Sequence, residues 1–324
     1  MTGIHLLLDG NNCAYRANCV TELYTKDGRR SSAIHGVLNI THSTIEKVSQ
    51  LLDMPVKEVI YGWDYGHAPR RKEVFPEYKA NRKKDESDED VEERKEWMTE
   101  FIEQANQLHQ NLPYFGVKSY KKKDWEGDDI LYAFKVAIEQ RYPEDTIVIV
   151  STDEDFHQLV NGNTCLFSPV KEVMYTPDNY EELMGIPQEC FLTYKILNGD
   201  GSDGIPGIKG IGPKTSKNLV NQYGNIDMIL SHKADLMKSK VTSRIFTQEG
   251  LEILDRNNKL INLADYVVLD EVHDDIEGVL DEEPYVDTKK VKDFLMSYQL
   301  TSILAKYKQW IETFREATYN YNEE

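Results

Sequence analysis

The sequence predicts an α/β fold in which a parallel sheet is flanked by helices and followed by a helical C-terminal region. Three short apolar runs, at residues 4–8, 56–62 and 146–150, have the length and composition of buried strands. Between the first two runs, residues 32–52 carry apolar side chains at helical spacing. A strand, a helix and a strand in this order predict parallel pairing with helices on both faces of the sheet.

Composition limits the class of protein. The chain has 324 residues, 40% of them hydrophobic, which is enough for one large domain with a smaller one or for two domains. Its four cysteines have neither metal-ligand spacing nor the density of a disulfide framework. No apolar run approaches the length of a membrane span. We therefore expect a soluble, cytoplasmic protein.

The charge is unevenly distributed along the chain. The formal net charge of −18 argues against general nucleic-acid binding, because phosphate contacts require Lys and Arg. We interpret the acidic run at 270–283 as a solvated face. Basic residues nevertheless cluster at 70–72, 79–84, 121–123 and 209–217.

Carboxylates follow the ends of the predicted strands and recur further along the chain. Ligands of parallel sheets lie beyond the carboxyl ends of the strands. Any one of these acids has a structural alternative, such as capping the helix that follows a strand. Together they would repel one another unless cations lay between them. Oxygen ligands alone favour Mg²⁺ or Mn²⁺ over zinc, and two ions about 4 Å apart would clamp a phosphoryl displacement. The candidate metal ligands are Asp9, Asp64, Glu126, Asp128, Asp129, Asp153, Asp155, Asp200 and Asp203.

The glycine-rich stretch 198–216 combines two of these acids with a candidate phosphate-binding element. Pro213 suits the first turn of a helix, whose free N–H groups would face a phosphate. A nucleotide-binding P-loop is excluded because Pro213 interrupts its pattern, and a dinucleotide loop would follow a strand, whereas 191–197 is helical in pattern. A plain glycine-rich connection remains the structural alternative. The candidate phosphate-binding residues are Gly207, Lys209, Gly210, Gly212, Lys214, Thr215 and Lys217.

Residues 66–112 form a long insertion after the strand that precedes Asp64. Such an insertion would project over the same edge of the sheet. Lys79 and Arg82, three residues apart, would share a helix face and point at a phosphate. Tyr78 would stack on a base or pack internally. The alternative is an ordinary basic surface helix.

Together these motifs resemble the 5′ nuclease family, which includes flap endonucleases, the 5′-nuclease domain of bacterial DNA polymerase I and phage exonucleases. The resemblance runs from about residue 4 to 225. It is carried in order by Asp9-Gly10 with 15–17, by 75–82, by 126–129, by 152–155 with 158–159, and by 198–216. It implies a PIN-like nuclease core at 1–185 with a helical arch at about 66–112. A helix-hairpin-helix-type DNA-binding region with C-terminal helices would occupy 186–324.

The resemblance also implies roles for individual residues. Asp128, Asp129 and Asp153 would hold a first metal ion, supported by Asp9, Asp64 and Glu126, and Asp155, Asp200 and Asp203 would hold a second. Lys79 and Arg82, with Tyr78 beside them, would stabilise charge on the scissile phosphate. A potassium ion would bridge the 207–212 backbone to DNA. Nucleic acid would also be contacted by Arg16, Arg70, Arg71 and Lys83.

The function expected from this resemblance is Mg²⁺-dependent 5′→3′ exonuclease and flap endonuclease activity. The substrate would be branched or 5′-ended DNA, including RNA/DNA hybrids, cut at a single-strand/duplex junction during replication or primer removal. The absence of a following polymerase favours a standalone monomer. The alternatives are a catalytically inactive branched-DNA-binding protein and a PIN-type ribonuclease. The acids at 85–93 would repel a threaded strand unless they face away from it.

Overall fold

A six-stranded sheet forms the centre of the computed structural model, which describes residues 2–82 and 88–322. Its strand order is β3-β2-β1-β4-β5-β6, and the first five of these strands run parallel while β6 is antiparallel. The predicted strands are confirmed as β1 (Ile4–Asp9), β2 (Val56–Trp63) and β4 (Thr146–Val150). Three further strands of this sheet were not predicted: β3 (Lys118–Lys121), β5 (Thr164–Ser168) and β6 (Val173–Tyr175).

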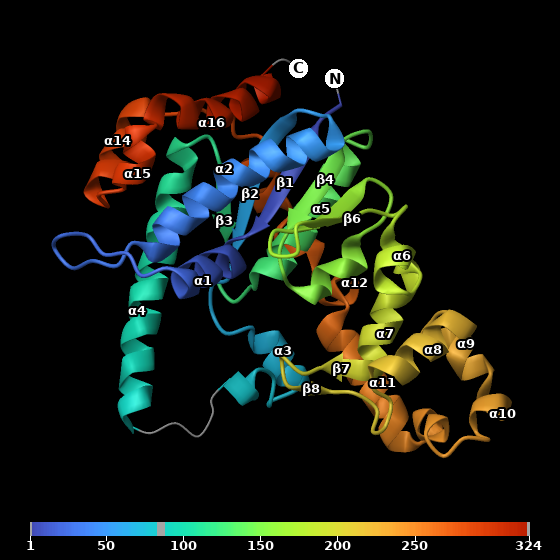
Figure 1. Ribbon diagram of the computed structural model, residues 1–324. Helices are drawn as coiled ribbons and strands as arrows, with labels where there is room; N and C mark the ends of the chain where they lie inside the picture. The colour runs from blue at the N-terminus through green and yellow to red at the C-terminus, as the bar shows by residue number, and fades with distance from the viewer. Residues whose placement is uncertain (1, 83–87, 323–324) are drawn as a thin grey trace.

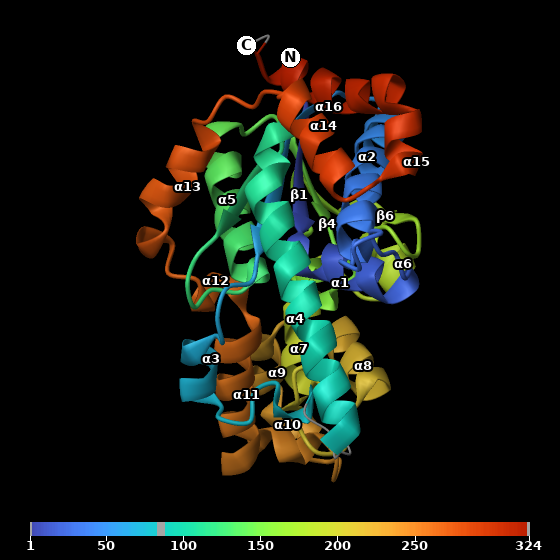
Figure 2. The same ribbon diagram turned by 90° about the vertical axis from the view of Figure 1, so that its left-hand side faces the viewer.

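Helices cover both faces of this sheet, as Figure 2 shows with the sheet seen nearly edge-on. Successive strand side chains point to opposite faces, so Leu6 and Leu8 join one core cluster and Leu7 the other. The first cluster packs under α1 (Gly10–Val20), α2 (Ser32–Leu52), α4 (Asp88–Asn111) and the C-terminal helices α14 (Thr288–Ser297), α15 (Thr301–Ala305) and α16 (Tyr307–Asn322). The second packs under α5 (Gly127–Arg141), α12 (Leu263–Tyr266) and α13 (His273–Leu280).

A second group of helices lies beyond the carboxyl ends of the strands, in the lower half of Figure 1. After α6 (Tyr180–Met184) and α7 (Phe191–Asn198), a small hairpin of β7 (Gly199–Asp200) and β8 (Ile205–Pro206) leads into α8 (Pro213–Tyr223). The chain continues through α9 (Ile226–Ser231), α10 (Lys233–Leu236) and α11 (Gln248–Ile261). These helices face the edge of the sheet at which the predicted acids lie.

The insertion after β2 contains α3 (Pro69–Val74), a short 3₁₀ helix at Ala80–Arg82, and α4. Lys79 does not share a helix face with Arg82 as predicted, because Lys79 lies outside this 3₁₀ helix with a left-handed φ of 59°. Lys83 and acids 85–87 lie outside the described residues, as do the side chains of 88–90. Within the part of the chain that is described, no helix is long and apolar enough to cross a membrane.

Candidate active site

Three neighbouring strands end in carboxylates at one edge of the sheet. Asp9 ends β1 and lies opposite Gly62 of β2 in the register, while Asp64 and Asp153 follow the ends of β2 and β4. The Asp9 Oδ1 accepts a hydrogen bond from the Asn12 N–H (3.0 Å) and so caps α1. The capping alternative is therefore correct for Asp9, which also belongs to the acidic edge.

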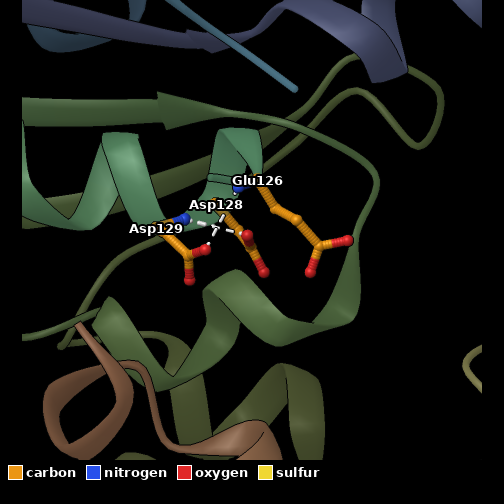
Figure 3. Close-up of side chains that lie close together, drawn as sticks. All are labelled: Glu126, Asp128 and Asp129. Atoms are coloured by element: carbon orange, nitrogen blue, oxygen red, sulfur yellow. Dashed lines mark hydrogen bonds between the residues drawn. The ribbon is translucent and has the colours of Figure 1, made fainter. Parts of the chain in front are cut away.

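The start of α5 brings three more carboxylates to this edge (Figure 3). One oxygen from each of Glu126, Asp128 and Asp129 lies within 4.8 Å of the others. Glu126 and Asp129 form a reciprocal capping box, and the Asp64 Oδ1 accepts a hydrogen bond from the Gly127 N–H (2.6 Å). The backbone bonds that begin the helix therefore also fix the directions of its acids.

A buried arginine faces the acids of α5. Arg71 of α3 is only 2% exposed, and its guanidinium donates hydrogen bonds to Glu126 and to Asp129, the latter at 2.8 Å from Nη2 to Oδ1. The sequence led us to expect a nucleic-acid contact from Arg71. The structure places it elsewhere, because a buried guanidinium held by carboxylates cannot reach a phosphate in this conformation.

Tyr78, Lys79 and Arg82, in the turn that precedes α4, also contact the acids of this edge. The Lys79 ammonium pairs with Glu126, and Arg82 Nη2 lies 2.7 Å from the Asp203 Oδ1. The buried Tyr78 donates its hydroxyl to Asp203 (2.9 Å) and Glu126 (3.0 Å), so it packs internally and does not offer a free ring. The Lys79 N–H also donates to the Asp203 backbone carbonyl (2.8 Å), which ties this turn to the β7–β8 hairpin.

The second group of acids surrounds a lysine that the sequence analysis missed. Lys195 of α7 is 5% exposed, and its Nζ lies 2.9 Å from the Asp155 Oδ1 and 2.6 Å from the Asp200 Oδ2. Asp203 belongs to the same turn as Asp200 but faces Arg82 and Tyr78. The predicted second group is therefore split between two cationic partners.

Burial and mutual repulsion raise the pKa of several of these carboxyls. Burial, reinforced by the charge of Asp64, raises the pKa of Asp9 to about 8. Burial also raises the pKa of Asp129 to about 7 and that of Asp155 to about 7. For Glu126, burial acts in the same direction, but Arg71 and Lys79 outweigh it and hold the pKa below its usual value. Full ionisation of these carboxyls is therefore unfavourable unless further cations bind among them.

The donor set fits a hard divalent cation. Nine carboxylates meet at this edge, and within residues 2–82 and 88–322 we find four basic side chains paired with them, on Arg71, Lys79, Arg82 and Lys195. A cavity of about 480 Å³ lies at this edge, and two of the nine acids, Asp153 and Asp200, line it together with Arg82 and Lys195. A donor set made of carboxylate oxygens suits Mg²⁺ or Mn²⁺.

The candidate phosphate-binding element begins as predicted at the N-terminus of α8. Gly212 precedes Pro213 there, and a Cβ added to Gly212 would meet open space, so a ligand's backbone has access. Gly210 has a left-handed φ of 85°. Gly207 serves the fold instead, because an added Cβ would lie 2.2 Å from the Asn198 carbonyl oxygen.

The lysines near α8 divide into two kinds. Lys209 and Lys214 are exposed, whereas Lys217 donates to the Met184 carbonyl (2.7 Å) and is half-buried. Arg244, which the sequence analysis did not single out, donates to the Lys209 carbonyl (2.6 Å) and so fixes this loop. Thr215 in the first turn of α8 is half-buried.

Two further predicted nucleic-acid contacts lie near the same edge. Arg16 of α1 lines a cavity of about 280 Å³ together with Asp153 and Lys171. Arg70 is partly exposed and pairs with Glu271. Neither Lys195 nor Arg244 had a signal in the sequence, because each acts on residues brought near by tertiary packing.

Both halves of the chain match models of known domains. Residues 5–185 match the 5′-3′ exonuclease, N-terminal resolvase-like domain, and residues 186–284 match the 5′-3′ exonuclease, C-terminal SAM fold. The DNA polymerase I of Lactococcus lactis is 27% identical over 266 residues, covering 79% of this chain. This chain spans 28% of the length of that polymerase. A 5′-3′ exonuclease of Aquifex aeolicus is 25% identical over 317 residues and covers 96% of both chains.

Solved structures share this fold. The T5 D15 protein crystallised with metal ions superimposes with a TM-score of 0.68 at 23% identity, covering 86% of this chain and all of that one. A complex of the bacteriophage T5 D15 flap endonuclease with DNA and metal ions gives a TM-score of 0.67 at 24% identity, with the same coverage.

Proposed function

This chain belongs to the 5′-3′ exonuclease family, and from that premise we propose that it is a structure-specific 5′ nuclease with exonuclease and flap endonuclease activity. The observation that carries the proposal is that acids from three strand ends, from the start of α5 and from the β7–β8 hairpin gather at one edge of the sheet. Two of them, Asp153 and Asp200, line a cavity there. The exposed N-terminus of α8 lies beyond the same edge of the sheet, and its N–H groups would bind a DNA backbone.

We propose that two Mg²⁺ or Mn²⁺ ions bind in this site. Asp128 and Asp153 with Asp9, Asp64 and Glu126 would hold one, and Asp155, Asp200 and Asp203 the other. Asp129, which the sequence also placed in the first set, is held by Arg71. When bound, such ions supply activation of water and neutralisation of phosphate charge. The assignment of K⁺ to residues 207–212 rests on the family resemblance, and the Lys209 carbonyl is already engaged by Arg244.

The basic side chains near the cleft would orient the scissile phosphate. Lys79 and Arg82 lie at the surface of the site, and both now pair with its carboxylates. Metal binding to Glu126 and Asp203 would weaken these pairs. The Lys79 ammonium and the Arg82 guanidinium would then donate hydrogen bonds to the phosphate oxygens, where negative charge develops during cleavage.

The proposed substrate is branched or 5′-ended DNA, with a role in replication or primer removal. Lys209, Lys214 and the first turn of α8 would grip the duplex without reading its sequence, because phosphate contacts carry no base information. We further propose that residues 1–185 form the nuclease core and that the DNA-binding region begins at 186. The last helices, α14–α16, pack on the sheet and not beside α8.

Cleavage of a 5′-labelled flap, with a blunt duplex as control, tests the proposal. We expect cutting near the junction in Mg²⁺ and none in EDTA. Asp155→Asn and Asp200→Asn should lose cleavage but retain flap binding, while Asp274→Asn, on the exposed face of α13, should cut normally. Tight flap binding that is insensitive to EDTA, without cutting by the unmodified protein, would instead favour a binding function.

A further inference from the structure

Arg71 lies at the junction of three parts of the molecule. It belongs to α3, after β2, and its guanidinium reaches the acids at the start of α5. On its other side it stacks over the Tyr266 ring at 4.0 Å, and its Nε donates to the Leu260 carbonyl (3.3 Å). Leu260 and Tyr266 belong to α11 and α12, within the C-terminal matched domain. One side chain thus joins the insertion, the acidic edge and the C-terminal region.

Both carboxylate oxygens of Asp129 accept hydrogen bonds, from Arg71 and from the backbone at the start of α5. Its Oδ1 accepts from Arg71 Nη2 (2.8 Å), and its Oδ2 accepts from Arg71 Nη1 (3.1 Å) and from the Glu126 N–H (3.2 Å). The Asp129 side chain is almost completely buried. Although its oxygens lie near those of Glu126 and Asp128, both are already occupied by strong donors.

The neighbouring carboxylates differ in access. Asp128 is one-quarter exposed, and its Oδ2 lies 3.5 Å from Arg71 Nη2, beyond a strong hydrogen bond. Glu126 gives one oxygen to Arg71 and the other to Lys79, which lies toward the cleft. Asp128 and the Glu126 oxygen that faces Lys79 therefore lie where a metal ion would compete only with the partly exposed Lys79 ammonium, whereas both Asp129 oxygens are held by the buried Arg71 guanidinium.

From these contacts we propose that Arg71 is a positioning residue, which holds Asp129 and Glu126 so that Glu126 and Asp128 face the metal site. Asp129 then acts as the anchor of Arg71 and not as a metal ligand. The proposal rests on the proposed function, because it assumes a metal ion at this edge. It also places Tyr266 and Leu260 among the groups that fix the site geometry.

The chemistry of arginine suits this role. A planar fork donates to both Asp129 oxygens at once, which an ammonium cannot do, so lysine is not an equivalent replacement. Removal of the guanidinium leaves buried carboxylates without their partner, which disturbs their directions as well as their charge. The first metal site should therefore respond to a change at Arg71 although Arg71 touches neither metal nor DNA.

A direct phosphate contact is the competing role, and salt dependence separates the two. Each phosphate contact with duplex DNA contributes about 0.9 to the slope of log affinity against log salt. An internal arginine contributes nothing to this slope. It should affect the affinity for Mn²⁺ instead.

The test compares Arg71→Lys and Arg71→Met with Lys72→Met, a change at the exposed neighbour on the same helix. Isothermal titration with Mn²⁺ measures metal affinity, and flap binding in EDTA at several salt concentrations measures the slope. We expect both Arg71 variants to weaken Mn²⁺ binding at least tenfold with an unchanged slope, and Lys72→Met to leave Mn²⁺ affinity unchanged. Asp129→Asn should weaken Mn²⁺ binding less than Asp128→Asn does.

Several outcomes would overturn the proposal. One is unaltered Mn²⁺ affinity in both Arg71 variants, with a slope reduced by about 0.9, and another is a larger loss from Asp129→Asn than from Asp128→Asn. If Arg71→Met does not fold, Arg71→Lys keeps the charge and decides by the same two measurements. Failure of the unmodified protein to cut flaps while Mn²⁺ still binds would refute the proposed function alone. Failure to bind Mn²⁺ would refute both.

Discussion

Replacement of Lys195 by methionine would remove the ammonium that lies between Asp155 and Asp200. Methionine keeps an unbranched side chain that fills similar space, so the change is chiefly one of charge. In the metal-free protein, two largely buried carboxylates would lose their nearest cation. We expect the Lys195→Met protein to be destabilised in EDTA and to become more dependent on divalent ions.

The magnitude follows from the burial of the three groups. Breaking a buried ion pair from one side costs about 3–5 kcal/mol. The Asp155 side chain is 15% exposed, so the lower end, about 3 kcal/mol, applies. An unfolding entropy of about 2.1 cal/mol/K per residue over 324 residues makes 1 kcal/mol equivalent to about 1.5 °C in Tm, so the expected loss is roughly 4–5 °C.

Divalent ions should reverse most of this loss. A ligand that binds only the folded state stabilises it by about 2.7 kcal/mol at 100 times its Kd. In the unmodified protein an ion must displace Lys195 from the oxygens it needs, whereas in the variant it need not. Mn²⁺ should therefore raise the Tm of Lys195→Met by more than it raises that of the unmodified protein.

Thermal unfolding in EDTA and in a Mn²⁺ series measures both effects. Lys259→Met is the matched control, because Lys259 pairs with Asp255 at 2.7 Å but both side chains are exposed. Exposed pairs contribute about 0–1 kcal/mol, so this control should change Tm little. Equal Tm values for Lys195→Met and the unmodified protein in EDTA, or equal gains in Mn²⁺, would refute the reasoning.

Three more changes test other parts of the molecule. Lys79→Ala should lower the single-turnover rate of flap cleavage by on the order of 100-fold while flap binding changes little, and an unchanged rate would remove Lys79 from the site. Gly207→Ala should cost about 1–3 kcal/mol in urea unfolding, because its Cβ would lie 2.2 Å from the Asn198 oxygen, whereas Gly212→Ala should be tolerated. Burial lowers the pKa of His157 to about 4. The folded state then resists protonation, so the stability due to neutral His157 is complete above pH 6.5 and is lost as pH falls toward 4. His157→Gln should remove roughly 3 kcal/mol of this acid destabilisation, and parallel pH profiles of the two proteins would contradict the assignment.

The sequence by itself determined the layout of the core and which acids gather at one edge of the sheet. Apolar periodicity is a local property, and it located residues 32–52 as a helix with the bounds that the structure has. Acids placed directly after parallel strands, such as Asp9 and Asp64, must meet at one edge, because such strands end together. The strands β3 and β5 were not predicted, because β3 (Lys-Ser-Tyr-Lys) has no apolar run and β5 (Thr-Cys-Leu-Phe-Ser) has only three apolar residues in a row.

Only the tertiary structure decided which basic side chain pairs with which acid. Arg71 and Asp129 are 58 residues apart, and their contact depends on how α3, α5 and α12 pack. A basic run in the sequence has the same appearance whether its arginine meets a phosphate or a buried carboxylate. Lys195 was missed for the same reason, because its distance from Asp155 is set by the position of α7 beneath the sheet edge. Hydrophobic patterning is encoded locally, whereas the pairing of buried charges is decided by long-range packing.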